Sequence, residues 1–227
     1  MSIVLIADSH LGSINSCESR LEGIVQTINK MSPDIVCIAG DLFNDDFGAI
    51  RDPERASSLF KGINATHGVF ACLGNHDGGS TLGQMKDFLE ESNIKLLNDE
   101  YEIIDGRLAL FGRVDSSPRG GFGELSRQDI SDAITSVSVN MPVVVMDHNP
   151  SNIDEYGSEV DLILAGHSHA GQIFPGNLLS RALFTVGYGH YQKDTASPHV
   201  IVTSGASTWG PPFRIGTSNE IVRIVIK

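Results

Sequence analysis

Five apolar, strand-like runs in this chain each end on side chains that bind metal ions. The polar residues that follow these runs are Asp8 and His10, Asp41, Asn75, His148, and His167 and His169. Short runs rich in Val, Ile and Leu that are closed by Gly or polar residues are typical of buried strands. In open α/β sheets, ligands bind just beyond the carboxyl ends of the strands. A single polar cluster of this kind is typical of a turn or a helix cap, but five of them indicate one shared metal site.

The spacing of these residues predicts which of them share an ion. Asp8 lies two residues before His10, and His167 two before His169. Because side chains two apart on an extended segment point the same way, we expect each pair to reach one ion together. Glycines stand immediately before three of the candidate ligands, at positions 40, 74 and 166. Glycine suits places where the chain turns sharply or where backbones approach closely.

The number of candidate ligands argues for two ions. The set comprises two carboxylates, one amide and four imidazoles. A structural zinc site is usually filled by about four protein ligands, so this set is too large for one ion. It suits two ions that share a bridging carboxylate. Buried carboxylates and imidazoles at one sheet edge would also be costly without a cation.

The order of the motifs resembles the calcineurin-like metallophosphoesterase superfamily. The motifs are D-x-H at 8–10, G-D at 40–41, G-N-H-D at 74–77, a lone His148, and G-H-x-H at 166–169. The last stretch, G-H-S-H-A-G-Q at 166–172, is similar to a bacterial subgroup whose motif usually reads G-H-T-H-G-G-Q. Several members of that subgroup are membrane-associated, and its relatives include lipid-precursor pyrophosphatases.

The resemblance implies a division of the ligands between two ions. The first ion would be held by Asp8, His10, Asp41 and His169, and the second by Asp41, Asn75, His148 and His167. Asp41 would bridge, with one carboxylate oxygen for each cation. Two ions roughly 3.5–4 Å apart can hold a hydroxide between them that attacks phosphorus. The mixed nitrogen and oxygen donors favour Mn²⁺, with Fe or Zn²⁺ as alternatives.

His76 is the expected general acid. It follows Asn75 directly, and adjacent side chains diverge in a turn, so we expect His76 to face the substrate and not an ion. The family usually has G-D-x-x-D, in which the second Asp orients this histidine. Here Asn44 stands at that position, followed by Asp45. Asn44 is therefore a candidate orienting residue through its amide oxygen, and Asp45 is the alternative if the loop shifts by one residue.

Length and composition narrow the class of protein. A chain of 227 residues with motifs over residues 8 to 169 predicts a single domain, 1–227. The net charge of −12, without a basic run, argues against bulk nucleic acid as substrate. We expect Cys17, Cys37 and Cys72 to be small core residues. A strand that begins at Ile3 and the lack of a long apolar run predict a cytoplasmic protein without a transmembrane segment, unless an anchor or signal precedes Met1.

The periodicity predicts alternating strands and helices, followed by a β-rich end. The expected helices are 17–31, 53–62, 80–92 and 126–138. Expected strands are 3–7, 34–39, 68–73, 94–97, 101–104, 107–112, 142–147, 160–165, 200–204 and 220–226, with a tight hairpin at Asp105-Gly106. This order suggests an α/β (α+β) fold of two facing mixed sheets with helices outside. The resemblance implies the same four-layer αββα sandwich, with the metal site at the strand carboxyl ends.

Two further segments have alternative interpretations. Residues 119–123 (RGGFG) are expected to form a glycine-rich surface loop, and the alternative is a lid or a phosphate nest. Residues 173–184 (IFPGNLLSRALF) are expected to be core and connecting loop. Their alternative role is to face an acyl chain or a membrane surface. Isolated arginines such as Arg181 and Arg214 are expected to be solvated, although each can reach a phosphate oxygen.

The predicted activity is hydrolysis of a phosphodiester or pyrophosphate bond by a dinuclear metallophosphoesterase. The expected substrate is a small-molecule or lipid-linked phosphoester, and contact with a membrane surface is an additional possibility. The alternatives are a non-catalytic scaffold of the same fold, a phosphomonoesterase or a nuclease. The intact ligand set argues against a scaffold, and the acidic charge argues against a nuclease. Oligomeric state does not follow from the sequence.

Overall fold

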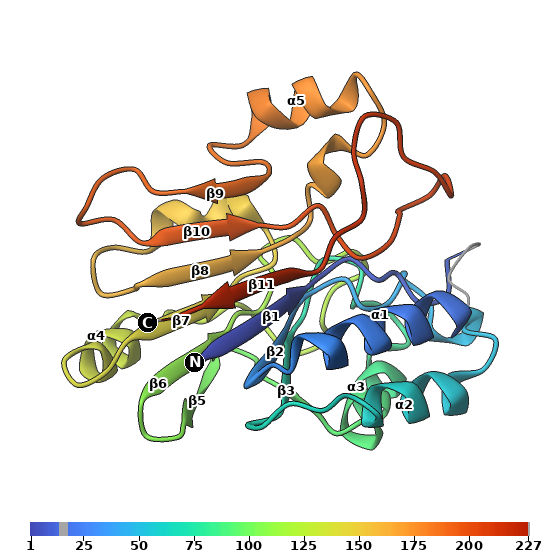
Figure 1. Cartoon of the computed structure of the whole chain (residues 1–227), viewed down its shortest axis with the longest axis horizontal. Helices are drawn as coiled ribbons and strands as arrows, with labels where there is room; N and C mark the ends of the chain where they lie inside the picture. The colour runs from blue at the N-terminus through green and yellow to red at the C-terminus, as the bar shows by residue number, and fades with distance from the viewer. Residues whose placement is uncertain (14–17, 227) are drawn as a thin grey trace.

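Two β-sheets face each other in this computed structural model, which describes residues 1–13 and 18–226 (Figure 1). The described strands of the first sheet, in spatial order, are β11 (Val222–Val225), β1 (Ser2–Ile6), β2 (Ile35–Ala39), β3 (Val69–Cys72) and β4 (Ile94–Leu96). Those of the second are β5 (Glu100–Ile104), β6 (Leu108–Gly112), β7 (Val143–Met146), β8 (Leu162–Ala165), β10 (His199–Val202) and β9 (Gly189–Tyr191). Neighbouring strands of a sheet can therefore come from distant parts of the chain, as β1 and β11 do.

Each sheet has a parallel centre and antiparallel edges. In the first sheet, β1 to β4 pair in parallel and β11 pairs antiparallel with β1. In the second, β6, β7, β8 and β10 pair in parallel, while β5 and β9 are antiparallel edge strands. Parallel neighbours end at the same edge of a sheet. The loops that leave β1, β2, β3, β7 and β8 therefore meet on one side of the molecule.

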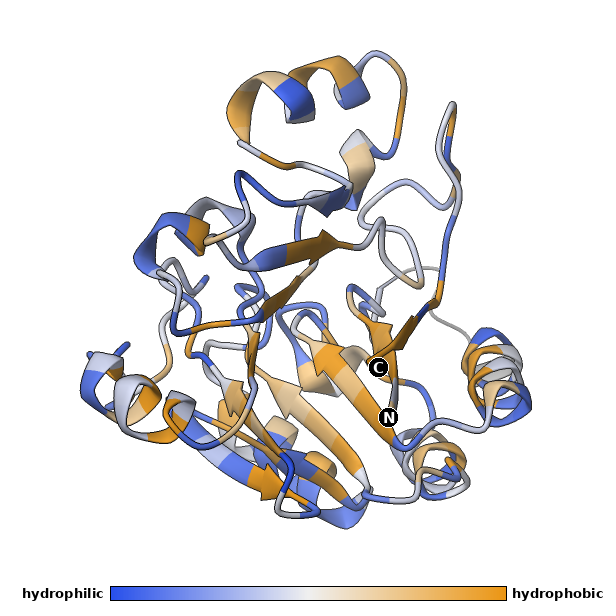
Figure 2. Cartoon of the chain, turned by 60° about the vertical axis from the view of Figure 1, so that its left-hand side comes forward, coloured by the Kyte–Doolittle hydropathy of each residue, from blue (hydrophilic) through white to orange (hydrophobic). Residues whose placement is uncertain are grey.

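Helices cover both outer faces of the paired sheets. The first sheet is covered by α1 (Glu18–Met31), α2 (Pro53–Lys61) and α3 (Leu82–Glu91), which share a buried cluster with its strands. The second is covered by α4 (Ser131–Ser138) and the short 3-10 helix η2 (Pro150–Glu155). Two further 3-10 turns are η1 (Phe47–Ala49) and η3 (His169–Gly171). The helix α5 (Gly176–Leu183) stands apart from both sheets (Figures 1 and 2).

The core depends on alternation along fully buried strands. In β1, Ile3 and Leu5 point into the cluster between the two sheets, whereas Val4 and Ile6 point to the cluster under the helices. Each such side chain contributes about 1.5–3 kcal/mol when it is fully buried. The expected four-layer αββα sandwich is confirmed. The apolar strands of the interior appear in orange in Figure 2.

Two segments differ from the sequence-based expectation. The helix expected at 126–138 begins only at Ser131, because Arg127 and Gln128 are held in a loop by Asp147 and by Asp99. The segment 173–184 was expected to be core and connecting loop, which is wrong. It forms α5, whose three leucines are 54–68% exposed.

Three smaller expectations have different outcomes. Cys37 and Cys72 are buried and free, as expected, whereas Cys17 lies outside the described residues. Among the described residues, no helix has the length and apolarity needed to cross a bilayer. The assignment of residues 1–227 to one domain stays a prediction.

Candidate metal centre

The seven predicted ligands meet at the edge where the parallel strands end. Five of them have positive φ angles between 46° and 68°: Asp8, His10, Asp41, His167 and His169. This left-handed backbone is costly for residues other than glycine and persists only where the surroundings hold it. Here the Asp8 N–H donates to Gly40 O at 3.1 Å, and the His10 N–H to Asp41 O at 3.1 Å. The first two motif loops therefore hold each other in a strained conformation.

The three motif glycines lie where other groups approach the backbone closely. A Cβ atom at Gly40 would lie 2.6 Å from His148 Nδ1, and one at Gly74 would lie 2.3 Å from Asp41 N. A Cβ atom at Gly166 would lie 2.6 Å from an Asp8 carboxylate oxygen. Such distances leave no room for any side chain. The expectation that these glycines mark close approaches is confirmed.

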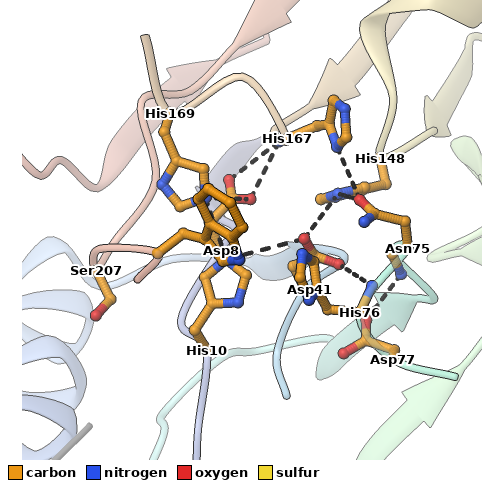
Figure 3. Close-up of polar contacts among 12 residues, drawn as sticks. Asp8, His10, Asp41, Asn75, His76, Asp77, His148, His167, His169 and Ser207 are labelled. Atoms are coloured by element: carbon orange, nitrogen blue, oxygen red, sulfur yellow. Dashed lines mark hydrogen bonds and ion pairs between the residues drawn. The ribbon is translucent and has the colours of Figure 1, made fainter. Parts of the chain in front are cut away.

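The first ligand group consists of Asp8, His10 and His169. One donor atom of each lies within 4.8 Å of the others. His10 Nε2 lies 3.1 Å from His169 Nε2, and His169 Nε2 lies 3.4 Å from Asp8 Oδ1. Figure 3 shows the three side chains converging from two loops, Asp8 and His10 from the loop after β1 and His169 from the loop after β8. The three ligand atoms point into one small space, an arrangement that suits a bound cation better than hydrogen bonds among the three side chains.

The second group consists of Asp41, His148 and His167, and Asn75 joins it through its amide oxygen. Asn75 Oδ1 lies 2.8 Å from His167 Nδ1 and 3.2 Å from His148 Nε2. His148 Nδ1 donates to Ala39 O at 2.8 Å, which turns Nε2 toward the centre. A backbone acceptor behind a histidine is the usual way of orienting a metal ligand.

Asp41 lies between the two groups. Its Oδ2 is 3.2 Å from His148 Nε2 and 3.8 Å from His10 Nε2. Its Oδ1 instead accepts a hydrogen bond from the His76 backbone N–H at 2.8 Å. The position suits a bridging ligand. A single oxygen, Oδ2, faces both groups, and the expected bridge through both carboxylate oxygens stays a prediction.

The two closely spaced histidines divide between the groups. His167 lies with Asp41 and His148, and His169 lies with Asp8 and His10. The expectation that they share an ion is therefore wrong. It assumed an extended segment, whereas both residues have left-handed φ angles of 68° and 50°. The division implied by the family resemblance has the same grouping as the structure, and metal binding by these residues stays a prediction.

The protonation states of the group members fit cation binding. Burial lowers the pKa of His10 and of His167 to about 4, so both are neutral at neutral pH, as metal ligands must be. Burial raises the pKa of Asp8 to about 7. For His148, burial opposes the charged form, but the charge of Asp41 outweighs it and raises the pKa well above the usual value. A buried cation would replace this proton as the partner of Asp41.

His76 faces the same space without joining either group. Its Nδ1 lies 2.9 Å from Asp45 Oδ1, and its ring packs edge-on against His10 at 5.0 Å. Asp45 thus has the orienting position considered for Asn44. The Asn44 side chain instead lies within hydrogen-bond reach of His10, where it opposes the lowering of the His10 pKa by burial. The choice of Asn44 is wrong because its loop is shifted by one residue, with the Asp45 N–H donating to His76 O at 3.0 Å.

Several residues that hold the site were not assigned a role from the sequence. Asp77 is buried and accepts the backbone N–H groups of Phe43 and Gly74 at 2.8 and 2.7 Å, so it ties the second and third motif loops together. Its place in the G-N-H-D motif was the available signal. Gln172, the last motif residue, donates to Trp209 O and accepts the Trp209 N–H, both at 2.8 Å.

Arg214 also holds the site and was not assigned this role from the sequence. It donates to His169 O at 2.8 Å and to Ser207 O at 2.6 Å, and it is not the solvated side chain that was expected. It therefore fixes the loop that carries the last ligand. No signal in the sequence could have found it, because its partners lie in separate loops.

Comparisons with known proteins agree with this geometry. A profile of the family described as calcineurin-like phosphoesterase matches residues 1–171. An uncharacterized metallophosphoesterase of Helicobacter pylori is 32% identical over 97% of this chain, and the chain spans 58% of that protein's length. An uncharacterized metallophosphoesterase of Aquifex aeolicus is 29% identical over the whole chain and 85% of that protein.

Vertebrate and structural relatives extend the comparison. A Danio rerio protein described as a transmembrane protein with metallophosphoesterase domain is 28% identical over the whole chain and 53% of that protein. Relatives therefore occur beyond bacteria. The crystal structure of a dimetal phosphatase from Danio rerio has a TM-score of 0.54 at 13% identity, with 98% of this chain and 91% of that chain covered, which shows the fold alone. Because the profile match covers residues 1–171, most of the sequence, the chain belongs to the calcineurin-like phosphoesterase family.

Proposed function

We propose that this protein hydrolyses a phosphodiester or pyrophosphate bond at a centre of two divalent ions, with Mn²⁺ as the first candidate and Fe or Zn²⁺ as alternatives. The observation that carries the proposal is the position of Asp41 Oδ2 between two ligand groups, with His76 beside them. When bound, two adjacent divalent ions supply a nucleophile from water at neutral pH and neutralise charge on the phosphate.

The protein's own residues supply the proton for the leaving group. His76 Nδ1 is held by the Asp45 carboxylate, so Nε2 is the nitrogen that remains for proton transfer. The backbone of His76 is fixed by the hydrogen bond to Asp41 Oδ1. His76 Nε2 gives its proton to the leaving oxygen as the bond between that oxygen and phosphorus breaks. Asp45 accepts the hydrogen bond from Nδ1 and so keeps the ring oriented while Nε2 transfers its proton.

The alternatives are less well supported. A non-catalytic scaffold has no use for His76 and Asp45 arranged beside seven converging ligands. A nuclease usually presents a basic surface, which the net charge of −12 opposes. A phosphomonoesterase would use the same centre, and substrate comparison distinguishes it.

The test is a substrate screen with matched histidine variants. Mn²⁺-reconstituted protein is assayed on aryl phosphodiesters, monoesters and nucleotide-sugar pyrophosphates, with and without chelator. His76→Ala should keep its metal content and lose roughly 10²–10⁴-fold in rate. His190→Ala is the control, because His190 lies exposed on β9 and pairs with His199. Wild-type protein that binds its ions but hydrolyses none of these substrates would overturn the proposal.

We further infer that the substrate carries an apolar group, as in a lipid-linked phosphoester. A pocket of about 470 Å³ opens directly beside His167 and His169. Its remaining wall is largely apolar and includes Leu179, Leu183 and Trp209. These three side chains are 47–68% exposed, and four further apolar residues from the same helix and its adjoining segments are also exposed: Phe174, Leu178, Phe213 and Ile215. Exposed apolar side chains beside a pocket are typical of a lipid or partner contact, so contact with a membrane surface is part of the same proposal.

Chain-length dependence tests this inference. Phosphodiesters that differ only in the length of an alkyl group should be hydrolysed with KM values that fall as the chain grows, since each buried CH₂ contributes about 0.8 kcal/mol. Leu179→Ser should weaken that dependence. Val139→Ser is the matched control, because Val139 is 80% exposed at the end of α4. A KM that does not change with chain length would contradict the apolar group but not the phosphoesterase activity.

A further inference from the structure

The side chain of Arg119 lies beside the His76 ring, next to its Nε2 atom. Arg119 Nη1 is 3.3 Å from His76 Nε2, the nitrogen that faces the leaving oxygen. Arg119 Nε is 3.7 Å from Asp45 Oδ1. The guanidinium and the imidazole thus share one carboxylate and point at one space. The expectation of a simple surface loop at 119–123 does not account for this placement.

The loop that carries Arg119 is fastened to the metal centre. The Arg119 backbone N–H donates to Asn75 O at 2.8 Å, and the Gly79 N–H donates to Gly121 O at 2.8 Å. Phe122 is only 3% exposed and packs in a cluster with Leu73. The backbone around Arg119 is therefore held by these hydrogen bonds and by the packing of Phe122. The Arg119 side chain is 52% exposed and accessible to a ligand.

Pairing with Asp45 alone is a weak reason for this position. The Nε to Oδ1 distance of 3.7 Å is long for a hydrogen bond, and both side chains are about half exposed. Exposed ion pairs of this kind contribute little to stability. His76 Nε2 has no negative charge that could pair with the guanidinium either. The guanidinium therefore has donors left for an anion, and a fork of N–H groups suits phosphate oxygens.

We propose that Arg119 binds a second phosphate on the leaving-group side of the scissile bond, so that the site selects pyrophosphate linkages over simple diesters. This inference rests on the proposed phosphoesterase function. The oxygen of one water forms a bond to the attacked phosphorus while the P–O bond to the leaving phosphate breaks. The leaving oxygen takes the proton from His76 Nε2, and the proton that the water releases to solvent balances the one that His76 takes back. An oxygen that accepts from Nε2 belongs to a phosphate whose other oxygens lie within reach of the Arg119 guanidinium. A leaving group without phosphate offers no such partner.

A binding experiment tests the proposal without turnover. Metal-loaded protein is titrated calorimetrically with methylenediphosphonate and with inorganic phosphate. Methylenediphosphonate is a pyrophosphate analogue whose P–C–P link is not hydrolysed. Arg119→Gln should weaken methylenediphosphonate binding roughly tenfold to a hundredfold and change phosphate binding less than about threefold. Arg107→Gln is the matched control, because Arg107 is 70% exposed and pairs with Asp105 in the hairpin between β5 and β6. It should change neither dissociation constant.

A kinetic comparison separates phosphate binding from an effect on His76. For Arg119→Gln, KM for a nucleotide-sugar pyrophosphate should rise by the same factor, while an aryl phosphodiester keeps its kcat and KM. Equal weakening of both probes, no weakening, or a fall in kcat on both substrates would overturn the role of Arg119. Wild-type protein that hydrolyses neither substrate contradicts the proposed function instead.

Discussion

The Asp45 carboxylate is the hydrogen-bond partner of His76, so an Asp45→Asn variant isolates what this contact contributes to proton transfer. Hydrogen bonds to charged groups contribute about 1.5–3 kcal/mol. Asp45 is 44% exposed, and screening by water reduces its contribution to about 1–1.5 kcal/mol. Because about 1.4 kcal/mol corresponds to a factor of ten, kcat should fall roughly fivefold to tenfold.

The assay uses two phosphodiesters that differ in their leaving group. An alkoxide leaving group needs the proton from His76, whereas a nitrophenolate scarcely needs one, so only the first substrate should show the full loss. Asn44→Ala is the matched control, because Asn44 is the neighbouring residue and lies near His10, not His76. Elemental analysis must show equal metal content in all variants.

A double-mutant cycle tests whether Asp45 acts through His76. In a His76→Ala background, Asp45→Asn should change the rate less than about twofold, because the two residues form one unit. The reasoning is refuted if Asp45→Asn keeps its full effect in that background. It is also refuted if Asn44→Ala causes the same loss as Asp45→Asn.

Three further variants or conditions test other parts of the structure. Asp41→Asn should reduce the metal content from about two ions to less than one, whereas Asp8→Asn should leave about one, as elemental analysis can show. Metal affinity should rise as the pH rises through about 7, because metal-free Asp8 has a pKa of about 7 and a proton on it competes with the cation. The raised pKa of His148 adds a second displaced proton, and calorimetry in buffers of different ionisation heat counts both; a pH-independent affinity would contradict this. Leu110→Ala, between the sheets, should lower the free energy of unfolding by about 2–5 kcal/mol, and Leu178→Ala, on exposed α5, by less than about 0.5 kcal/mol, as measured by denaturant titration.

Local features of the fold were predictable from the sequence because neighbouring residues encode them. The apolar face of the expected helix 80–92 matches α3, whose buried residues are Leu82, Met85, Phe88 and Leu89. The expected hairpin at Asp105-Gly106 has the two left-handed residues that a tight turn requires, with φ angles of 53° and 64°. Periodicity and turn chemistry are properties of a few consecutive residues, so no tertiary contact is needed to read them.

The sequence by itself also placed all seven candidate ligands at strand ends, because each stands within a few residues after an apolar run. It could not give the direction of their side chains. His167 and His169 diverge because their backbones are left-handed, and contacts with loops far away in the chain hold that conformation. Asp45, not Asn44, meets His76 for the same reason: the register of one loop against another sets the choice.

Only the tertiary structure decided which distant groups support the centre. Arg214 contacts a ligand that is 45 residues away in the sequence, and Arg119 contacts His76 from 43 residues away. Residues 173–184 are apolar enough for a core, yet most of them form the exposed helix α5 (Gly176–Leu183) beside the candidate metal centre. Composition measures how apolar a segment is, but whether other elements cover it depends on how the whole chain folds.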